Sequence, residues 1–494
     1  MGYRKHHFTA LALAVALAPP ARAADPTSAA VDRVMTDALK SWQVPGAALV
    51  VVRGDQTLVL KGYGRKSLAT PDAVTPDTLF PLASCSKAFT SALLATLADE
   101  GKVNWDDPVR NHLPSFRLAD PHADAMVTMR DLLSHRTGLG GHDLLWYRAP
   151  WGVDEVLKKI EKMPLDYPFR GGFEYSSLMY MAAGRAAARV TGQAWEKLVR
   201  DRLCDPLGMG CYFTTKDIPP LADRTGGHRR GKNGVEAMAT YEMPEPNPAG
   251  SVHATARDLA AWLKFQIAGG VTGNGRRLVS AQNLIETRTP QNIIRLDGAA
   301  RRMNPDTTQL SYGLGWVICD HRGKLVVAHG GQIDGGRVQI TFLPDEKLGI
   351  ALLNNLHESR MNQAVTNTLI DMYCNLPPRD WNAFFQKIVT DDEAAKRDAL
   401  AARDKARMPN TKPSVAAEGF AGEYEHPVWG TAKVVAAGGK LVVEWSSFRC
   451  PLEHYQNDEF RITDGHFADE LVEFAGPGGK VTAVRFHDVV YRRK

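Results

Sequence analysis

The stretch Ser84-Cys85-Ser86-Lys87 places a hydroxyl and an amine three residues apart, just ahead of a run with helical periodicity. Apolar residues recur every four positions from Phe89 to Leu97, which is the spacing of one buried helical face. Because residues three apart on a helix lie one turn above each other, Lys87 is expected beside the Ser84 oxygen. The backbone N–H of Ser84, at the start of this helix, is free to bind an oxyanion. One turn therefore offers a nucleophile, a basic neighbour and an oxyanion donor.

Ser-x-x-Lys alone arises by chance about once in a chain of this length, as a solvated lysine after a capping serine. Two further elements follow it in order, Tyr175-Ser176-Ser177 and His329-Gly330-Gly331. With these residues the sequence resembles the serine β-lactamase and penicillin-binding-protein superfamily, in its class C-like serine hydrolase branch. The motifs of that family are Ser-x-x-Lys, Tyr-x-Asn, and Lys-Thr-Gly or its His-x-Gly variant. The resemblance spans roughly residues 30–375 and includes the phrases Asp131–Leu139, Pro206–Met209 and Tyr312–Trp316.

The resemblance implies acyl transfer through a covalent intermediate on Ser84. A base must take the proton of Ser84, and a lysine with the reference pKa of about 10.4 is a poor base at neutral pH. Desolvation could lower the pKa of Lys87, and Lys87 could in turn stabilise Tyr175 as a phenolate. We assign Lys87 and Tyr175 jointly as base and proton shuttle, because the two groups would share one coupled proton. Without the other motifs, Tyr175 would be assigned to the core.

The third motif is expected on a strand edge that faces the nucleophile. Gly330 and Gly331 would let the backbone of a substrate approach closely and add as an extra strand. Carried over from the family, the backbone N–H of Gln332 would be the second oxyanion donor beside that of Ser84. A purely structural role for His329 is the alternative.

Two residues depart from the strict penicillinase pattern. Ser177 stands where Tyr-x-Asn has asparagine, and a hydroxyl is shorter than an amide and has a single donor. His329 stands in place of lysine and, with an unperturbed pKa of about 6.5, would anchor a substrate carboxylate weakly at pH 7. Both changes argue against an efficient β-lactamase or a dedicated D-Ala-D-Ala carboxypeptidase. Esters, small amides and D-amino peptides remain open as substrates.

The N-terminus has the order of a secretory signal peptide: basic residues, an apolar run from Phe8 to Ala18, and small residues at Ala21 and Ala23. We expect cleavage after Ala23 and a periplasmic or secreted bacterial protein, with an uncleaved anchor as the alternative. Loss of residues 1–23 removes three basic residues and no acid, which lowers the formal net charge from +5 to +2. This near-neutral chain gives no case for nucleic-acid binding, and it contains no further membrane segment.

The fold class expected from pattern and resemblance is α+β. Strands are expected at Gly46–Arg53 and Thr57–Tyr63, and again between Gly313 and Leu353, with a largely helical middle. They would form an antiparallel sheet flanked by helices, a β-lactamase/DD-peptidase-like fold with a helical subdomain and the active site between the two. The predicted units are a signal peptide (1–23), the hydrolase domain (24–378), a helical linker (379–416) and a small all-β barrel, similar to a lipocalin (417–494). The barrel is expected to pack against the main domain; substrate binding by it is the alternative.

Other chemistries find little support in the sequence. No Gly-x-Ser-x-Gly, His-Glu-x-x-His or Cys-x-x-Cys motif is present, so no metal and no organic cofactor is implied. His135 and His142 lack ligand spacing and are assigned structural roles. The six cysteines support no particular disulfide: Cys204 and Cys211 could pair, or each could be a free thiol.

The sequence therefore predicts an exported serine hydrolase that cleaves an ester or amide bond, with a D-amino peptide among the candidate substrates. A class C-type β-lactamase is the first alternative. A non-catalytic penicillin-binding or peptidoglycan-sensing protein is the second. The partner is a small-molecule or peptide substrate, and the oligomeric state is left open. Substrate choice is expected to depend on the loops 141–152 and 216–247.

Overall fold

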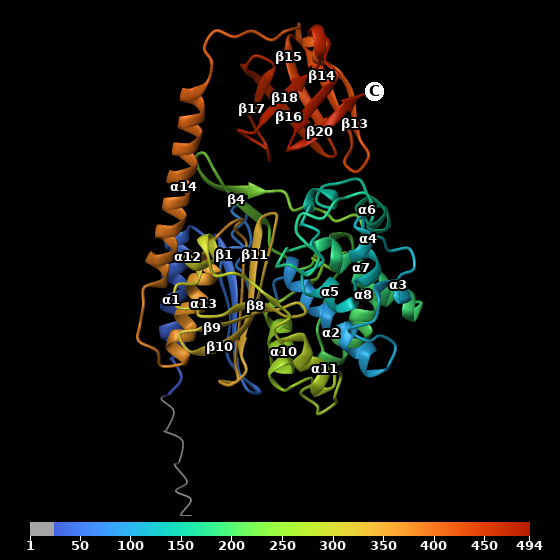
Figure 1. Ribbon diagram of the computed structural model, residues 1–494. Helices are drawn as coiled ribbons and strands as arrows, with labels where there is room; N and C mark the ends of the chain where they lie inside the picture. The colour runs from blue at the N-terminus through green and yellow to red at the C-terminus, as the bar shows by residue number, and fades with distance from the viewer. Residues whose placement is uncertain (1–23) are drawn as a thin grey trace, which may run out of the picture.

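The computed structural model describes residues 24–494 and contains one large antiparallel sheet and one closed barrel (Figure 1). The sheet has the strand order β2-β1-β12-β11-β10-β9-β8-β7. Strands from both ends of the hydrolase segment therefore meet at its centre, where β1 pairs with β12. This confirms the expected antiparallel sheet. The strands are β1 (Gly46–Arg53), β2 (Gln56–Gly64), β7 (Asn292–Ile293), β8 (Leu310–Tyr312), β9 (Val317–His321), β10 (Lys324–Ile333), β11 (Gly336–Leu343) and β12 (Leu348–Asn354).

The central strands are apolar on both faces because helices cover both sides of the sheet. Every residue of β12, and all of β1 except Arg53, is buried. On one face α1 (Ser28–Trp42), α13 (Met361–Tyr373) and the start of α14 (Trp381–Ala406) form one hydrophobic core with the sheet. The second core lies on the other face, between the sheet and the helical region. The active site is built at the junction with this second core.

The helical region fills the chain between β2 and β7 and confirms the expected helical subdomain. Its central element is α2 (Ser86–Asp99), which is buried on all sides from Ser86 to Leu97. This differs from the single buried face that the spacing from Phe89 to Leu97 predicts, because α2 is surrounded by other helices and the sheet (Figure 1). The remaining helices of this region are α3 (Val109–His112), α4 (Pro121–Met126), α5 (Met129–Leu133), α6 (Val153–Ile160), α7 (Ser177–Thr191), α8 (Trp195–Val199), α9 (Asp205–Leu207), α10 (Ala256–Ile267) and α11 (Ala281–Thr287). The short helix α12 (Gly298–Met303) follows β7 and lies outside this region.

Two short antiparallel pairs of strands complete the hydrolase part. They pair β3 (Phe80–Pro81) with β6 (His253–Ala254), and β4 (Gly227–Gly231) with β5 (Gly234–Met238). The first pair ties the residues before the nucleophile to the segment ahead of α10. That connection helps to fix the turn that carries Ser84.

The C-terminal unit is a closed barrel in which each strand pairs antiparallel with its neighbours. Buried and exposed residues alternate along its strands, and the inward side chains, Phe420, Tyr424 and Trp445 among them, form a filled core. The expected all-β barrel is therefore present. Its elements are α15 (Ala417–Phe420), β13 (Gly422–His426), β14 (Gly430–Ala437), β15 (Lys440–Trp445), β16 (Phe448–Gln456), β17 (Glu459–Ile462), β18 (Leu471–Ala475), β19 (Ala483–Phe486) and β20 (Val489–Arg493).

The barrel contacts the hydrolase part directly, through the turn between β13 and β14. Val428 in this turn is 3% exposed and belongs to the hydrolase core, and its carbonyl accepts a hydrogen bond from Lys159 Nζ at 3.0 Å. The hydroxyls of Ser446 and Ser447 donate to the carbonyl of Arg148 at 2.6 and 2.8 Å. The long helix α14 joins the two parts along another side of the molecule (Figure 1). The barrel is thus held by packing and hydrogen bonds as well as by its connection.

Two further properties concern the chain as a whole. Cys204 and Cys211, the pair that could have bonded, are both buried free thiols. Between residues 24 and 494, no helix combines the length and apolar character needed to cross a membrane. The predicted signal peptide lies outside the described residues.

Candidate active site

Ser84 lies in a short 3₁₀ turn, Ala83–Cys85, immediately before α2. Ala83 has a φ of 47°, in the left-handed region that alanine rarely adopts, and is buried. Such a conformation persists only when the surroundings fix it, and it is found at functional sites more often than elsewhere. Here the N–H of Leu82 donates to the carbonyl of Val252 at 2.8 Å, beside the β3–β6 pair. The turn therefore presents Ser84 from a strained, tightly held backbone.

Strand β10 packs closely against this turn at Gly331. A Cβ built on Gly331 would lie 2.1 Å from the carbonyl oxygen of Leu82 and 3.2 Å from the backbone nitrogen of Ser84. Glycine is needed here because the nucleophile turn itself occupies the space that we expected a substrate backbone to use. A Cβ on Gly330 would lie 3.2 Å from the side-chain oxygen of Gln339 and at an ordinary contact distance of 3.9 Å from the carbonyl oxygen of Val338, on the opposite face of the sheet. The two glycines thus have different surroundings.

The amine of Lys87 is fully buried next to the nucleophile. Its Nζ lies 3.2 Å from Ser84 Oγ, 3.3 Å from Ser177 Oγ and 3.1 Å from the carbonyl oxygen of Ala249. Burial lowers the pKa of Lys87 to about 7, although the negative charge of Asp143 acts in the opposite direction. Among residues 24–494, no carboxylate forms an ion pair with it. Lys87 can therefore be a neutral amine near neutral pH.

The three neighbours of Lys87 suit its neutral form. A neutral amine has two N–H groups and one lone pair. The carbonyl of Ala249 can only accept, and Ser177 Oγ can accept the second N–H. The lone pair is then left for the hydroxyl proton of Ser84. The carbonyl of Ala249 escaped the sequence analysis because a backbone acceptor has no side-chain signature.

Tyr175 lies on the other side of the nucleophile, two residues before α7. Its hydroxyl is hydrogen-bonded to Ser84, and its ring centroid lies 4.8 Å from Lys87 Nζ. Burial raises the pKa of Tyr175 well above its ordinary value, and the hydrogen bond with Ser84 lowers it only in part. The site therefore favours the phenol over the phenolate. Ser84, Lys87, Tyr175 and Ser177 are brought together as the motifs predict.

His329 is buried in a cluster of aromatic rings and does not line the substrate cavity. Its Nε2 lies 2.9 Å from the hydroxyl of Tyr312, and its Nδ1 lies 2.7 Å from the carbonyl oxygen of Gly330. Because a carbonyl only accepts, the ring proton sits on Nδ1 and Nε2 accepts from Tyr312. Burial, aided by the charge of Lys87, lowers the pKa of His329 to about 3. The ring is neutral and turned away from substrate, which fits the structural alternative better than the expected contact with substrate.

Residues 329–333 of β10 pair with β11 but extend beyond the part of β10 that pairs with β9. One edge of β10 is therefore without a strand partner over this segment, among the residues that the structure describes. Gln332 lines the same cavity as Ser84 at this edge. The two backbone N–H groups of Ser84 and Gln332 remain the predicted oxyanion donors.

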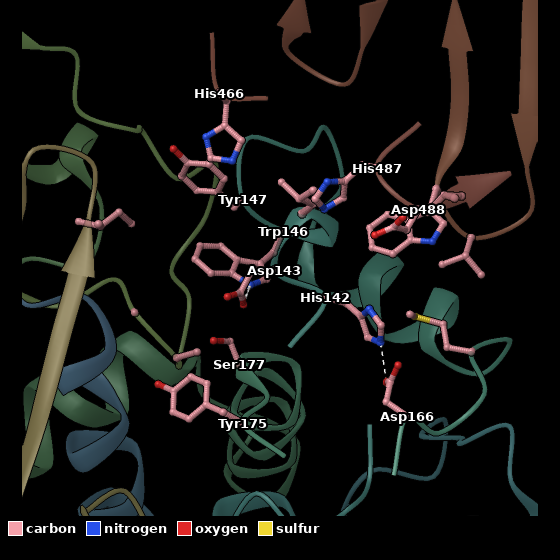
Figure 2. A pocket seen from close by; sticks show the side chains of 18 of the residues that line it. His142, Asp143, Trp146, Tyr147, Asp166, Tyr175, Ser177, His466, His487 and Asp488 are labelled. Atoms are coloured by element: carbon pink, nitrogen blue, oxygen red, sulfur yellow. Dashed lines mark hydrogen bonds and ion pairs between the residues drawn. The ribbon is translucent and has the colours of Figure 1, made fainter. Parts of the chain in front are cut away.

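The cavity above Ser84 has a volume of about 1080 Å³ and reaches from the nucleophile to the barrel. Its inner end contains Ser84, Tyr175 and Ser177, and the loop 142–147 forms one side (Figure 2). The barrel supplies the outer wall, with His426–Trp429, His466 and His487–Val490. The loop 141–152 was predicted to shape substrate choice; of the other predicted loop, 216–247, only Met238 reaches the cavity.

Sequence reasoning missed the barrel wall. The residues of this wall belong to no sequence motif. In the structure His487 and Asp488 have positive φ angles and form a turn between strands. Asp143 was also missed as an individual residue. It points toward Ser177 in the cavity (Figure 2), and one of its oxygens accepts from Trp146 Nε1 at 2.8 Å. No group of three or more histidine, cysteine or acidic residues suited to a metal occurs in residues 24–494.

Comparison with known proteins gives two matching family models. The model described as "Beta-lactamase" matches residues 31–373, and a domain of unknown function, DUF3471, matches residues 406–493. A protein named as an unguisins hydrolase from Aspergillus violaceofuscus is 29% identical over 495 residues, covering 92% of this chain and 86% of that protein.

Two solved structures have a similar fold. The octameric penicillin-binding protein homologue from Pyrococcus abyssi has a TM-score of 0.59 at 18% identity, covering 94% of this chain and 99% of that one. The D-amino acid amidase from Ochrobactrum anthropi has a TM-score of 0.57 at 23% identity, covering 70% of this chain and 98% of that one. The first of these likenesses extends into the barrel.

Proposed function

Because the chain belongs to the β-lactamase family and is a serine hydrolase, we propose that it cleaves an ester or amide bond through an acyl-Ser84 intermediate. One observation carries this proposal: a buried lysine amine without a carboxylate partner lies 3.2 Å from the serine hydroxyl. The geometry is that of a nucleophile beside a general base. The strained turn and the neighbouring glycine support it, because they hold Ser84 at one position.

In the proposed acylation step, Ser84 Oγ attacks the carbonyl carbon of the substrate and gives its proton to the lone pair of Lys87. The bond from carbonyl carbon to leaving group then breaks, and the leaving group takes a proton from the site. Tyr175 is the proposed shuttle for that proton, since its hydroxyl is hydrogen-bonded to Ser84. In deacylation, water attacks the acyl-Ser84 ester with the same groups in reversed roles.

The backbone N–H groups of Ser84 and Gln332 are the proposed oxyanion donors. Each such donor typically contributes about 2.7–4 kcal/mol to transition-state stabilisation. The unpartnered edge of β10 beside Gln332 supports this assignment, because a substrate carbonyl can reach it from the cavity.

The proposed substrates are small molecules or peptides, D-amino peptides among them. One relative is named an unguisins hydrolase, and one protein of similar fold is named a D-amino acid amidase. The cavity of about 1080 Å³ exceeds what a short ester needs, which supports an extended substrate. Two features argue against efficient β-lactam hydrolysis. Ser177 stands in place of asparagine, and His329 is neutral and does not line the cavity. We also propose that the protein is exported, on the strength of the signal-peptide pattern in residues 1–23.

Hydrolysis of short-chain p-nitrophenyl esters by the mature protein, beside Ser84→Ala, tests the proposal. We expect turnover that depends on Ser84 and a covalent adduct of one acyl group on that residue. Equal background rates in both proteins, with no labelling of Ser84 by a fluorophosphonate, would overturn it. A slow, persistent acyl adduct without turnover would favour a penicillin-binding protein, and rapid hydrolysis of nitrocefin would favour a β-lactamase.

A further inference from the structure

His135 is a buried neighbour of Tyr175. Neither the sequence motifs nor the proposed reaction gives it a role. Its backbone carbonyl accepts the N–H of Glu174 at 2.9 Å, and its ring Nδ1 accepts the N–H of Ser176 at 3.0 Å. These are the two residues that flank Tyr175 in the chain. One residue thus holds the backbone on both sides of the catalytic phenol.

The ring of His135 also lies against the ring of Tyr175. Their centroids are 4.2 Å apart with an interplanar angle of 37°. A third contact fixes His135 itself: Asn292 Nδ2 donates to the carbonyls of Ser134, His135 and Gly172, at 3.2, 3.0 and 3.0 Å. Tyr175 is therefore restrained along its backbone and on one face of its ring.

The backbone of His135 is itself in an unusual conformation. Its φ is 56°, in the left-handed region, and the residue is fully buried. Histidine is one of the few residue types enriched there, with asparagine and aspartate. Such a conformation persists only when the contacts around it hold it. His135 thus keeps a strained backbone beside the proposed catalytic residue Tyr175. This strain is better explained by the need to place Tyr175 than by a gain in stability.

These contacts require a neutral ring with its proton on Nε2, since Nδ1 accepts from Ser176. Protonation would place a second donor opposite the N–H of Ser176 and break the contact. Burial lowers the pKa of His135 well below its ordinary value, and repulsion from Lys87 and His329 in their protonated forms acts in the same direction. The other titratable groups whose rings face His135 are Tyr175, Tyr180 and Tyr312. Its buried Nε2 has no hydrogen-bond partner among the described residues.

We propose that His135 is a positioning residue, which holds Tyr175 against Ser84 through the two flanking backbone amides and through its ring face. This inference rests on the proposed function, because it assigns His135 a role in the same reaction. It explains why a polar ring with one unpaired nitrogen is retained in a buried aromatic cluster, where an apolar ring would avoid the cost of that nitrogen. An apolar ring would offer no acceptor to Ser176.

Two variants distinguish positioning of Tyr175 by the His135 acceptor from simple packing of the His135 ring. His135→Asn keeps an acceptor near the place of Nδ1 and tolerates a positive φ, whereas His135→Ala removes both acceptor and ring. Rates with p-nitrophenyl acetate are divided by the fraction of Ser84 that a fluorophosphonate labels, so that misfolded protein does not count. We expect kcat to fall about 100-fold in His135→Ala and His135→Asn to recover at least about tenfold of that loss.

The pH profile is the readout that a purely structural role would not move. Removing the ring admits water beside Lys87, so the acidic limb of kcat/KM should move to higher pH in His135→Ala. His228→Ala is the matched control: His228 is also buried and accepts a backbone N–H, that of Leu68, at 3.0 Å, but lies outside the cavity. We expect His228→Ala to be less stable than wild type. Its kcat per labelled site and the pH of the acidic limb of its kcat/KM should both be unchanged.

Equal kcat per labelled site in wild type and His135→Ala, with an unmoved acidic limb, would overturn the inference. A second measurement does not depend on turnover: ¹⁵N NMR of the His135 ring between pH 5 and 9. We expect a neutral ring with its proton on Nε2 throughout this range. A ring that is charged, or protonated on Nδ1, would overturn the proposed positioning role of His135. If the wild type showed no turnover dependent on Ser84, the proposed function would fail while the NMR result still decided the positioning role.

Discussion

The inner and outer halves of the active-site cavity are built in opposite ways. At the inner end, Lys87 and Ser177 are buried, and the Lys87 amine has hydrogen-bond partners in Ser84, Ser177 and the carbonyl of Ala249. At the outer end the barrel contributes exposed side chains, such as His487 and Asp488 from the turn between β19 and β20, and Val490 from the start of β20. A buried, satisfied site fixes geometry, while an exposed wall on a second domain can vary without disturbing the chemistry. From this contrast we expect bond cleavage to depend on the inner half and substrate choice on the outer half.

The largest effect should follow from removal of the inner base. Lys87→Ala leaves Ser84 without a proton acceptor and opens a hole in a buried site. We expect kcat/KM for p-nitrophenyl acetate to fall about 10⁴-fold, the upper end for general-base catalysis. Stopped-flow measurement of acylation would show whether the loss lies in that step. A loss below tenfold would mean that another group takes the proton.

A smaller but still large effect should come from a single methyl group on β10. Gly331→Ala would place a Cβ 2.1 Å from the carbonyl oxygen of Leu82, so the nucleophile turn must move. We expect kcat to fall about 100-fold, as for a displacement near 1 Å, together with a lower Tm. The control is Gly330→Ala, whose Cβ would come closest to the flexible end of Gln339. Equal rates in the two variants would contradict a tightly fitted inner half.

The inner half should also set the dependence of rate on pH. Acylation needs the neutral amine of Lys87, and burial lowers the pKa of that group to about 7. Activity should therefore be present above pH 7 and decline below it, by about tenfold per pH unit for a single protonation. The acidic limb of kcat/KM, measured with an ester that is stable from pH 5 to 9, checks this. A limb near pH 10 would mean that Lys87 is solvated and charged.

The outer half should affect selectivity more than rate. Val490 is 40% exposed on the cavity wall, so Val490→Asp places a charge there without a cost in core packing. We expect the ratio of kcat/KM for p-nitrophenyl hexanoate over acetate to fall about tenfold, as expected for the loss of apolar contact worth about 1.4 kcal/mol. Leu221→Asp, at a 99% exposed position outside the cavity, is the control. An unchanged ratio in Val490→Asp would remove the barrel from substrate selection.

The smallest effect concerns Ser177. In Ser177→Asn the longer amide can both donate to a substrate carbonyl and accept from Lys87. We expect the acylation rate with a β-lactam such as nitrocefin to rise severalfold, roughly as one hydrogen bond contributes. An unchanged or lower rate would count against this interpretation of the missing asparagine.

The sequence predicted the inner half far better than the outer half, for a physical reason. Ser84 and Lys87 are three residues apart, so local helical geometry alone brings them together. Tyr175 and Ser177 needed a family motif, since nothing local links them to Ser84. The contact of Val428 with the hydrolase core joins segments that are far apart in the chain, and it depends on how two folded surfaces dock.

Two inner features were also beyond the sequence. The left-handed backbone of Ala83 cannot be anticipated from alanine, which has no preference for it. His135 was given a structural role because an isolated histidine has no spacing to interpret. Its importance appears only when both neighbours of Tyr175 are seen to bond to it. At His329 the motif favoured contact with substrate, whereas the structure buries the ring against Tyr312, outside the lining of the cavity.

The placement of the barrel has a consequence for how the protein is made. Every proposed catalytic residue precedes Asn354, the end of β12, whereas the outer wall of the cavity begins at His426. A chain emerges from the ribosome N-terminus first, and its domains generally fold in that order. The chemistry can therefore be assembled before the wall that screens substrates exists. During synthesis the enzyme would pass through a stage in which it is reactive but indiscriminate, and docking of the last strands would end it.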